Sequence, residues 1–104
     1  MMKEKSTRTL ERKLVQLRDQ MFSLFPIMRG SVVEIGNKNK QPHFSLNKSN
    51  KTNLLYLGKS RESAAKKCSA NYKKMMLLVD EMTLINMELL KRRVDPTEID
   101  YENS

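Results

Sequence analysis

The chain has 104 residues, a formal net charge of +8 and one cysteine, which excludes an intrachain disulfide. With 38% apolar and 31% charged residues it can bury only a modest core, and its length favours one domain. The four acids of residues 95–104 have no base among them, so residues 1–94 carry 20 basic and 8 acidic side chains. We therefore predict a single basic domain over residues 1–94 and a disordered acidic tail over residues 95–104.

The excess of positive charge bears on partners and location. It favours a polyanionic partner, of which nucleic acid is the first to consider. No segment approaches the ~20 apolar residues that a membrane span requires. The N-terminal sequence MMKEKSTRTLERK lacks an apolar signal core. We expect a cytoplasmic protein without a membrane partner.

Apolar residues at spacings of 4, 3, 4 and 3 predict a first helix over residues 7–25. Ser6 or Thr7 can cap its start by accepting backbone N–H bonds. Pro26 is expected to end it, because the residue before a proline disfavours the helical conformation. The apolar face consists of Leu10, Leu14, Leu17, Met21 and Leu24.

The middle of the chain alternates apolar and polar residues, which predicts three strands over residues 31–35, 43–48 and 51–57. Ser49 and Asn50 form a two-residue hairpin turn between the last two strands. Such an alternation is typical of an antiparallel sheet with one covered face.

The turn sets the register of the hairpin, with Phe44 opposite Leu55 and Leu46 opposite Asn53. Alternation then divides the side chains between two faces. The face predicted to be covered holds Val33, Ile35, Phe44, Leu46, Leu55 and Leu57. The half-polar face holds His43, Ser45, Asn47, Thr52, Leu54 and Tyr56.

A long helix is predicted over residues 61–93, capped by Ser60. Its apolar residues extend beyond one stripe, so it needs cover on more than one side, and about residues 84–90 remain as a candidate dimer surface. Asn86 either fixes the register of such a contact or points to water. The apolar seam consists of Ala65, Cys68, Tyr72, Met75, Val79, Met82, Asn86 and Leu89.

These elements predict an α+β fold of order α-β-β-β-α. A small antiparallel three-stranded sheet is braced by two antiparallel helices.

Catalytic and metal chemistry are not expected. His43 and Cys68 are the only histidine and cysteine, so no four-ligand zinc site of the usual type can form within one chain. Cys68 lies on an apolar helix face, which favours a buried, inert thiol. We predict no enzyme activity, no catalytic residue, no metal and no cofactor.

Four short stretches carry a family resemblance: RGSVVE at residues 29–34, PHFSLNK at 42–48, KTNLLYLG at 51–58 and INMELL at 85–90. Over about residues 10–90 the chain resembles a family of short prokaryotic proteins encoded beside transposases and other mobile elements. The central loop of that family usually holds several cysteines that suggest metal binding. This sequence has EIGNKNKQ there, so the resemblance implies no metal role here.

Residues 29–73 are also similar to the arm-type DNA-binding domain of tyrosine-family integrases. In that domain a three-stranded sheet enters the major groove of DNA and a helix braces its back. The contacts that the resemblance implies are Lys38, Lys40, Ser45, Asn47, Lys48, Lys51, Asn53 and Tyr56.

The favoured function is a nucleic-acid-binding accessory protein of a mobile element or phage, with DNA preferred over RNA. Lysines would contact phosphates, Asn47 and Asn53 base edges, and Tyr56 an unpaired base. The predicted binding residues are Arg29, Lys38, Lys40, Asn47, Lys48, Lys51, Asn53, Tyr56, Lys59, Arg61, Lys66 and Lys67.

The alternative is a non-enzymatic protein-interaction module, an adaptor or inhibitor, that uses the long helix. Its partner would be a second copy of the chain or another protein. The predicted partner surface consists of Met75, Val79, Met82, Asn86 and Leu89.

Overall fold

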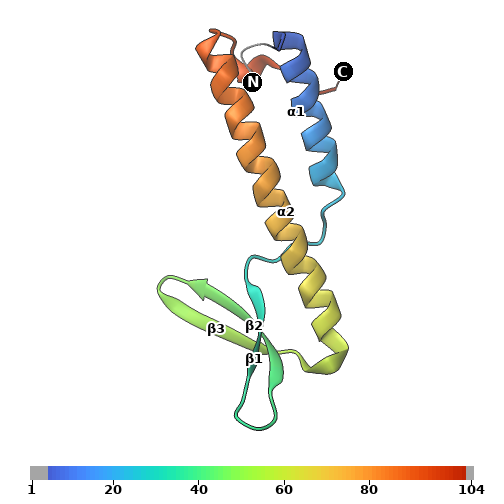
Figure 1. The fold of residues 1–104 in the computed structure, drawn as a ribbon, viewed down its shortest axis with the longest axis vertical. Coiled ribbons are helices and arrows are strands. Elements are labelled where there is room, and N and C mark those ends of the chain that lie inside the picture. The colour runs from blue at the N-terminus through green and yellow to red at the C-terminus, as the bar shows by residue number, and fades with distance from the viewer. Residues whose placement is uncertain (1–4, 103–104) are drawn as a thin grey trace. The chain divides into compact units, whose positions relative to one another are not determined.

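The computed structural model describes residues 5–102 (Figure 1). The order of elements confirms the predicted α-β-β-β-α arrangement and the α+β class. The elements are α1 (Thr7–Phe22), β1 (Ser31–Ile35), β2 (Gln41–Lys48), β3 (Lys51–Tyr56), α2 (Gly58–Lys91) and the short 3-10 helix η2 (Pro96–Glu98).

The helix ends differ from the predicted ones for local reasons. α1 ends at Phe22 because Ser23 caps it, with both its backbone N–H and its hydroxyl donating to the Gln20 carbonyl. α2 ends at Lys91 because Arg93 adopts a left-handed φ of 62°. The N–H of Val94 then donates to the Leu89 carbonyl at 2.9 Å and closes the last turn.

The chain divides into two compact units, whereas a single domain was expected. Residues 24–74 form the sheet unit. The described residues before and after it, 5–23 and 75–102, form the helix-pair unit. Each unit has its own small apolar cluster, which accords with the low apolar content of the chain.

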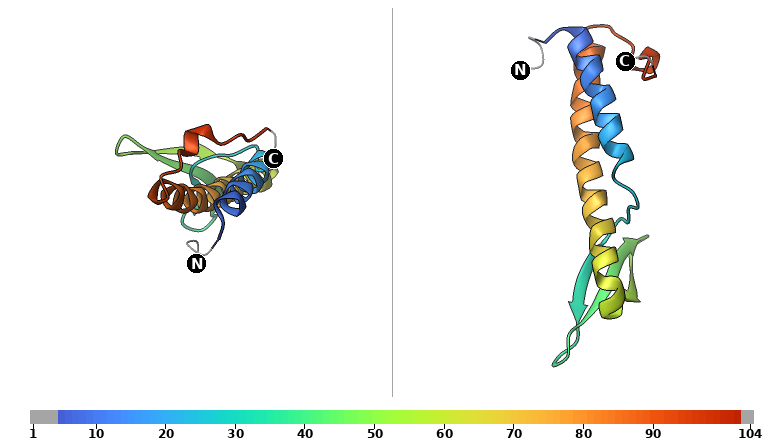
Figure 2. Two further views of the ribbon diagram at one scale, coloured as in Figure 1. Left: turned by 90° about the horizontal axis from the view of Figure 1, so that it is seen from above. Right: turned by 90° about the vertical axis from the view of Figure 1, so that its right-hand side faces the viewer.

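In the helix-pair unit, α1 runs antiparallel to the C-terminal half of α2, as the views of Figures 1 and 2 agree in showing. Ser6 caps α1 by accepting a bond from the Thr9 N–H at 3.1 Å. The two helices are held together by a cluster of buried apolar side chains. Fully burying one leucine side chain contributes about 1.5–3 kcal/mol, so this cluster dominates the stability of the unit. The buried cluster consists of Leu10, Leu14, Leu17, Ile85 and Leu89.

Residues 95–102 are folded onto this cluster, so the prediction of a disordered tail does not describe them. Val94, Ile99 and Tyr101 pack against the buried leucines. Arg18 donates to the Tyr101 carbonyl at 2.9 Å, and its guanidinium carbon lies 5.7 Å from the Tyr101 ring centre. Acidic charge alone favours a solvated segment, but these apolar side chains hold it on the cluster. Residues 103–104 lie outside the described residues.

We expect the docking of this segment to weaken in acid. The pKa of Asp95 is lowered because the Thr97 hydroxyl and backbone N–H both donate to its carboxylate. A carboxyl whose pKa is lower in the folded state stabilises the fold above its unfolded pKa. That contribution is lost as the pH falls through the folded value. Asp95→Asn should therefore flatten the pH dependence of thermal unfolding below about pH 4.

Thr97→Val, which removes the hydroxyl donor, should act in the same direction: it should lower the melting temperature near neutral pH, and its difference from the wild type should disappear in acid. A pH dependence identical to that of the wild type in both variants would contradict this role of Asp95.

In the sheet unit the strands are antiparallel in the order β1-β2-β3. The predicted hairpin register is confirmed, with Phe44 opposite Leu55 and Leu46 opposite Asn53. Ser49 and Asn50 have φ values of 53° and 62°. Two successive positive φ values are typical of the tight turn that matches the strand twist.

The covered face of the sheet differs from the prediction in β1. Val32 is the cross-strand partner of Phe44 and packs against its cluster, so Val33 and Ile35 belong to the other face. Leu55 shares the covered face but is 51% exposed, because β3 is an edge strand beyond the reach of the small cluster. The cluster consists of Phe44, Leu57 and Ala65, with Met28, Val32 and Leu46 packed against it.

The helical cover of the sheet comes from the first turns of α2, which supply Ala65 to that cluster. Hydrogen bonds hold residues 28–30, which precede β1, to α2. Ser69 Oγ donates to the Gly30 carbonyl at 2.7 Å, and the Met28 N–H donates to the Cys68 carbonyl at 3.1 Å.

Candidate nucleic-acid interface

The net positive charge of the chain belongs entirely to the sheet unit. Residues 24–74 hold 11 basic and 2 acidic side chains, a net of +9. The rest of the chain holds 9 basic and 10 acidic side chains, a net of −1. One of the two acids, Glu62, has its carboxylate 2.9 Å from Lys66 Nζ. The sheet unit is therefore the part that can attract a polyanion.

Two lysines face each other beside the hairpin turn. Lys48 of β2 and Lys51 of β3 are direct cross-strand partners, and both are exposed. Like charges placed directly opposite each other destabilise an antiparallel pair. An anion bound between the two ammonium groups removes that repulsion, so the pair suits a phosphate.

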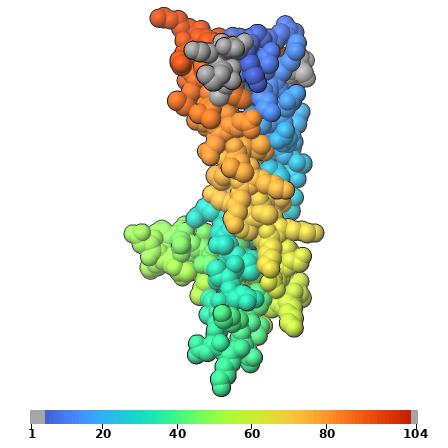
Figure 3. Space-filling model, in the orientation of Figure 1, coloured from blue at the N-terminus to red at the C-terminus, as the bar shows by residue number. Residues whose placement is uncertain are grey.

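Lys38 and Lys40 lie in the loop between β1 and β2, at the other end of the sheet. The eight residues of β2 separate this loop from the hairpin turn by about 23 Å at the usual rise per residue. Figure 3 shows both ends projecting from the sheet unit. The predicted sheet lysines thus form two groups, one at each end of β2.

The open face of the sheet, opposite the face that α2 covers, lies between these two ends. His43 and Tyr56 are cross-strand partners there, with ring centres 5.5 Å apart in an edge-on arrangement. Leu54 and Tyr56 are 53% and 51% exposed. Ser45 stands opposite Leu54. The open face therefore combines aromatic rings and an exposed leucine with small polar side chains.

The two asparagines predicted to contact bases lie on opposite faces. Asn47 is on the open face opposite Thr52, whose hydroxyl donates to Asn47 Oδ1 at 2.8 Å. Asn53 pairs with Leu46 and so belongs to the face that α2 covers. A single face of the sheet therefore cannot present both amides to a ligand. On the open face, the neighbour of Asn47 is Thr52 and not the predicted Asn53.

The two predicted arginines are held by backbone carbonyls. Arg29 Nη1 donates to the Asn47 carbonyl at 2.9 Å. Arg61 donates from Nε to the Leu57 carbonyl at 2.9 Å and from Nη2 to the Tyr56 carbonyl at 2.7 Å. Their charges are thereby fixed beside the ends of β2 and β3.

The lysines of α2 form a separate surface. Ala65 and Ser69 are buried toward the sheet, whereas the lysines at the other helical positions are exposed and point away from it. Three of these lysines were predicted. Lys73 and Lys74 follow Lys66 and Lys67 by seven residues each, and this repeat is the sequence signal that could have found them. The helix lysines are Lys59, Lys66, Lys67, Lys73 and Lys74.

Much of the predicted partner surface of α2 is not exposed. Leu89 is 0% and Met75 is 7% exposed, so both lie inside the chain. Met82 packs against the helix-pair cluster. Val79 is 36% exposed. Asn86 is half-buried, and its Oδ1 is buried without a hydrogen-bond partner among the described residues.

A different part of α2 is exposed and apolar. The residues that pack on α1 recur at 78, 82, 85 and 89, and the apolar residues between them point away from α1. We call this surface the outer face of α2. Its exposed apolar residues are Met76, Leu77, Val79, Leu84, Met87 and Leu90.

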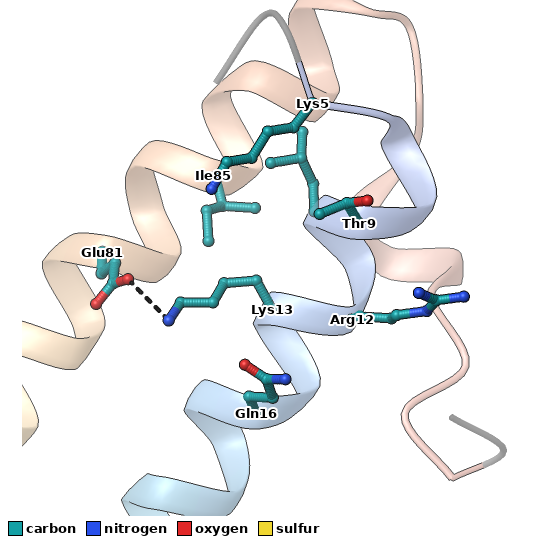
Figure 4. Close-up of a pocket in the computed structure, with 8 residues that line it drawn as sticks. Lys5, Thr9, Arg12, Lys13, Gln16, Glu81 and Ile85 are labelled. Atoms are coloured by element: carbon teal, nitrogen blue, oxygen red, sulfur yellow. Dashed lines mark ion pairs between the residues drawn. The ribbon is translucent and has the colours of Figure 1, made fainter. Parts of the chain in front are cut away.

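A groove of about 340 Å³ lies between α1 and the C-terminal half of α2 (Figure 4). Leu10 and Ile85 contribute its apolar lining, and Lys13 Nζ lies 3.6 Å from a Glu81 carboxylate oxygen. Both charged side chains are nearly half exposed, so this ion pair contributes little to stability. The remaining lining is polar or basic and presents no pairing of a nucleophile with a base.

Within residues 5–102, no three or more His, Cys, Asp or Glu side chains are placed to hold a metal ion. In the same part of the chain, no helix has the length and apolar content needed to cross a membrane.

Comparisons with protein-family models, curated proteins and solved structures found no match. The two resemblances seen in the sequence therefore stay expectations.

Proposed function

We propose that the protein is a small basic nucleic-acid-binding accessory protein whose sheet unit contacts duplex DNA through the β2–β3 hairpin. The observation that carries this proposal is the net charge of +9 on residues 24–74 against −1 on the rest of the chain. Attraction to phosphates supplies most of non-specific binding and is strongly dependent on salt.

The two groups of sheet lysines support a defined pose. The major groove of B-DNA is about 12 Å wide and admits a two-stranded ribbon. The ends of β2 are about 23 Å apart. With the open face over the groove, the turn end of β2 with Lys48 and Lys51 and the loop end with Lys38 and Lys40 lie over the flanking phosphate backbones. Lys48 and Lys51 belong by alternation to the other face of the sheet, so their long, exposed side chains reach a phosphate around the end of the hairpin.

The open face supplies groups of the kind that contact base edges. Asn47 offers an amide whose orientation Thr52 fixes, and Ser45 offers a hydroxyl. Leu54 offers an exposed apolar side chain of the kind that contacts a thymine methyl. Duplex DNA is the preferred ligand, because the deep, narrow major groove of A-form RNA does not admit side chains.

The setting in which we place this function is cytoplasmic, on a mobile element or phage. The support for that setting is the resemblance of residues 29–73 and 10–90 described above.

The proposal is tested with two charge-reversal variants that have the same net charge. Lys48→Glu/Lys51→Glu changes the hairpin, and Lys73→Glu/Lys74→Glu changes exposed positions on α2 that were not predicted to bind. Fluorescence anisotropy with labelled duplex DNA, single-stranded DNA and duplex RNA across a salt series gives the affinity and its salt dependence. Far-UV circular dichroism checks that both variants fold.

We expect the wild type to prefer duplex DNA and to weaken steeply with salt. The hairpin variant should lose about two units of the slope of log K against log salt, because two phosphate contacts are gone. The α2 variant should keep the wild-type slope. Equal losses in both variants would remove the hairpin as the contact, and no binding by the wild type at low salt would overturn the proposal.

A second candidate function is a protein-interaction module that uses the long helix. The exposed apolar residues of the outer face favour it, because contiguous apolar surface marks protein contacts. The two functions differ in salt dependence: a contact between apolar helix faces persists at salt concentrations that release DNA.

A further inference from the structure

The outer face of α2 has the spacing of a helix-packing seam. Leu77, Asp80, Leu84, Met87 and Lys91 recur at intervals of 3, 4, 3 and 4 residues. This spacing keeps side chains on one side of a helix and fits a second helix packed along it. The seam is distinct from residues 78, 82, 85 and 89, which pack on α1. α2 therefore has two packing sides, and α1 occupies one of them.

The charges in the seam are arranged symmetrically. Asp80 and Lys91 lie at equal distances from a midpoint between residues 85 and 86, and Leu84 and Met87 are symmetric about the same point. A two-fold axis at that midpoint places a second α2 antiparallel to the first. Each Asp80 then faces a Lys91 of the other copy, and each Leu84 faces a Met87.

We propose that the occupant of the outer face is a second copy of this chain, packed antiparallel in that register. Two inner layers of Leu84 against Met87 are then apolar, and two outer layers pair Asp80 with Lys91. A parallel pair would instead place Asp80 against Asp80 and Lys91 against Lys91, which is unfavourable. The charge pattern thus selects both the orientation and the register.

Both charged groups are available for this contact. Among the described residues Asp80 has no ion-pair partner. Lys91 Nζ lies 3.9 Å from Glu88, and its side chain is 76% exposed. Glu88 is held mainly by Arg92, whose Nε donates to it at 2.9 Å. Lys91 can therefore turn to a carboxylate of another copy at little cost.

The flank of the seam adds to the contact. Met76, Thr83 and Leu90 recur at spacings of seven residues along one side of it. An antiparallel copy in that register places Leu90 level with residue 81 of the other chain, beside the Thr83 of that chain on the same flank. Leu90 is 60% exposed in a single chain, and this packing removes much of that surface from water.

The test is sedimentation equilibrium of the full chain without nucleic acid, on the wild type and on charge-swap variants. The wild type should be a dimer that persists in high salt, because the inner layers are apolar. Asp80→Lys and Lys91→Asp each place like charges opposite each other twice per dimer. Each should raise the dimer Kd by roughly tenfold or more.

The double variant Asp80→Lys/Lys91→Asp restores opposite charges in the antiparallel register and should return the Kd toward the wild-type value. Leu84→Glu, at an exposed position, should abolish the dimer and leave the helical circular dichroism signal unchanged.

Three results would overturn the proposal. One is a wild type that stays monomeric at high micromolar concentration, which would leave the outer face to a different protein. Another is single swaps without effect. The third is a double swap that fails to restore the dimer. The residues involved lie outside residues 24–74, so this inference does not rest on the nucleic-acid proposal, and each can fail in its own assay.

Discussion

Gly30→Ala is expected to destabilise the sheet unit by about 2–5 kcal/mol, the sum of backbone strain and overpacking. Gly30 has a φ of 142°, a conformation that residues with a side chain rarely adopt. A Cβ at this position would lie 2.5 Å from the Ser45 carbonyl oxygen and 2.7 Å from two ring atoms of Phe44. Both distances are far inside van der Waals contact.

Neither neighbour of Gly30 can move away easily. Ser45 lies within β2 and is the cross-strand partner of Ser31, so its carbonyl is fixed by the register of the sheet. Phe44 is 5% exposed and is the largest member of the cluster that holds α2 to the sheet. The Gly30 carbonyl also accepts the 2.7 Å bond from Ser69. The clash therefore falls on the sheet and its helical cover together.

Gly58→Ala is the matched control. Gly58 also has a positive φ, 65°, but the nearest atom to a Cβ there is the Tyr56 hydroxyl oxygen at 3.5 Å. Only the backbone strain of about 1 kcal/mol is expected. Urea unfolding followed by far-UV circular dichroism compares the two variants. A Gly30→Ala variant as stable as Gly58→Ala would show that Phe44 and β2 yield more easily than the structure indicates.

The sheet could be predicted closely from the sequence because its alternation and its turn are local signals. Pairing across the Ser49–Asn50 turn leaves one register, and the structure has it. The covered face of β1 could not be predicted in the same way, because valines at both 32 and 33 allow either face of the strand to be the apolar one. The face of β1 is decided by hydrogen bonds that Gly30 and Met28 make with α2. The bonded residues lie about 40 positions apart in the sequence, so no local pattern reports them.

The surfaces of the long helix could be predicted less well, because α2 is apolar around much of its circumference. A spacing of 3 and 4 residues fits the predicted seam of Met75, Val79 and Met82. It fits the observed packing positions 78, 82, 85 and 89 equally well. Only the position of α1 and of the docked residues 94–101 selects between them. The sequence assigns the sheet lysines to the loop and to the turn. Their grouping at the two ends of β2 follows only once the strand register is known.

Leu89→Ala is expected to destabilise the helix-pair unit by about 2–5 kcal/mol, whereas Leu90→Ala should cost less than about 0.5 kcal/mol. The two leucines are adjacent and chemically identical, but Leu89 is 0% and Leu90 is 60% exposed. Leu89 packs among the buried leucines of α1, where truncation leaves a cavity. A whole domain is stable by only about 5–15 kcal/mol, so the loss at Leu89 is a large fraction.

Urea unfolding checks this pair, at a protein concentration low enough that dilution no longer moves the midpoint. Under that condition self-association adds nothing to stability, and Leu90→Ala reports the single chain alone. At higher concentration the same variant should weaken the dimer, because Leu90 flanks the outer seam. If Leu90→Ala costs as much as Leu89→Ala in the single chain, the side of α2 that meets α1 is not the one described. The outer face would then lose its basis as a surface for a second copy, since its residues would already be buried.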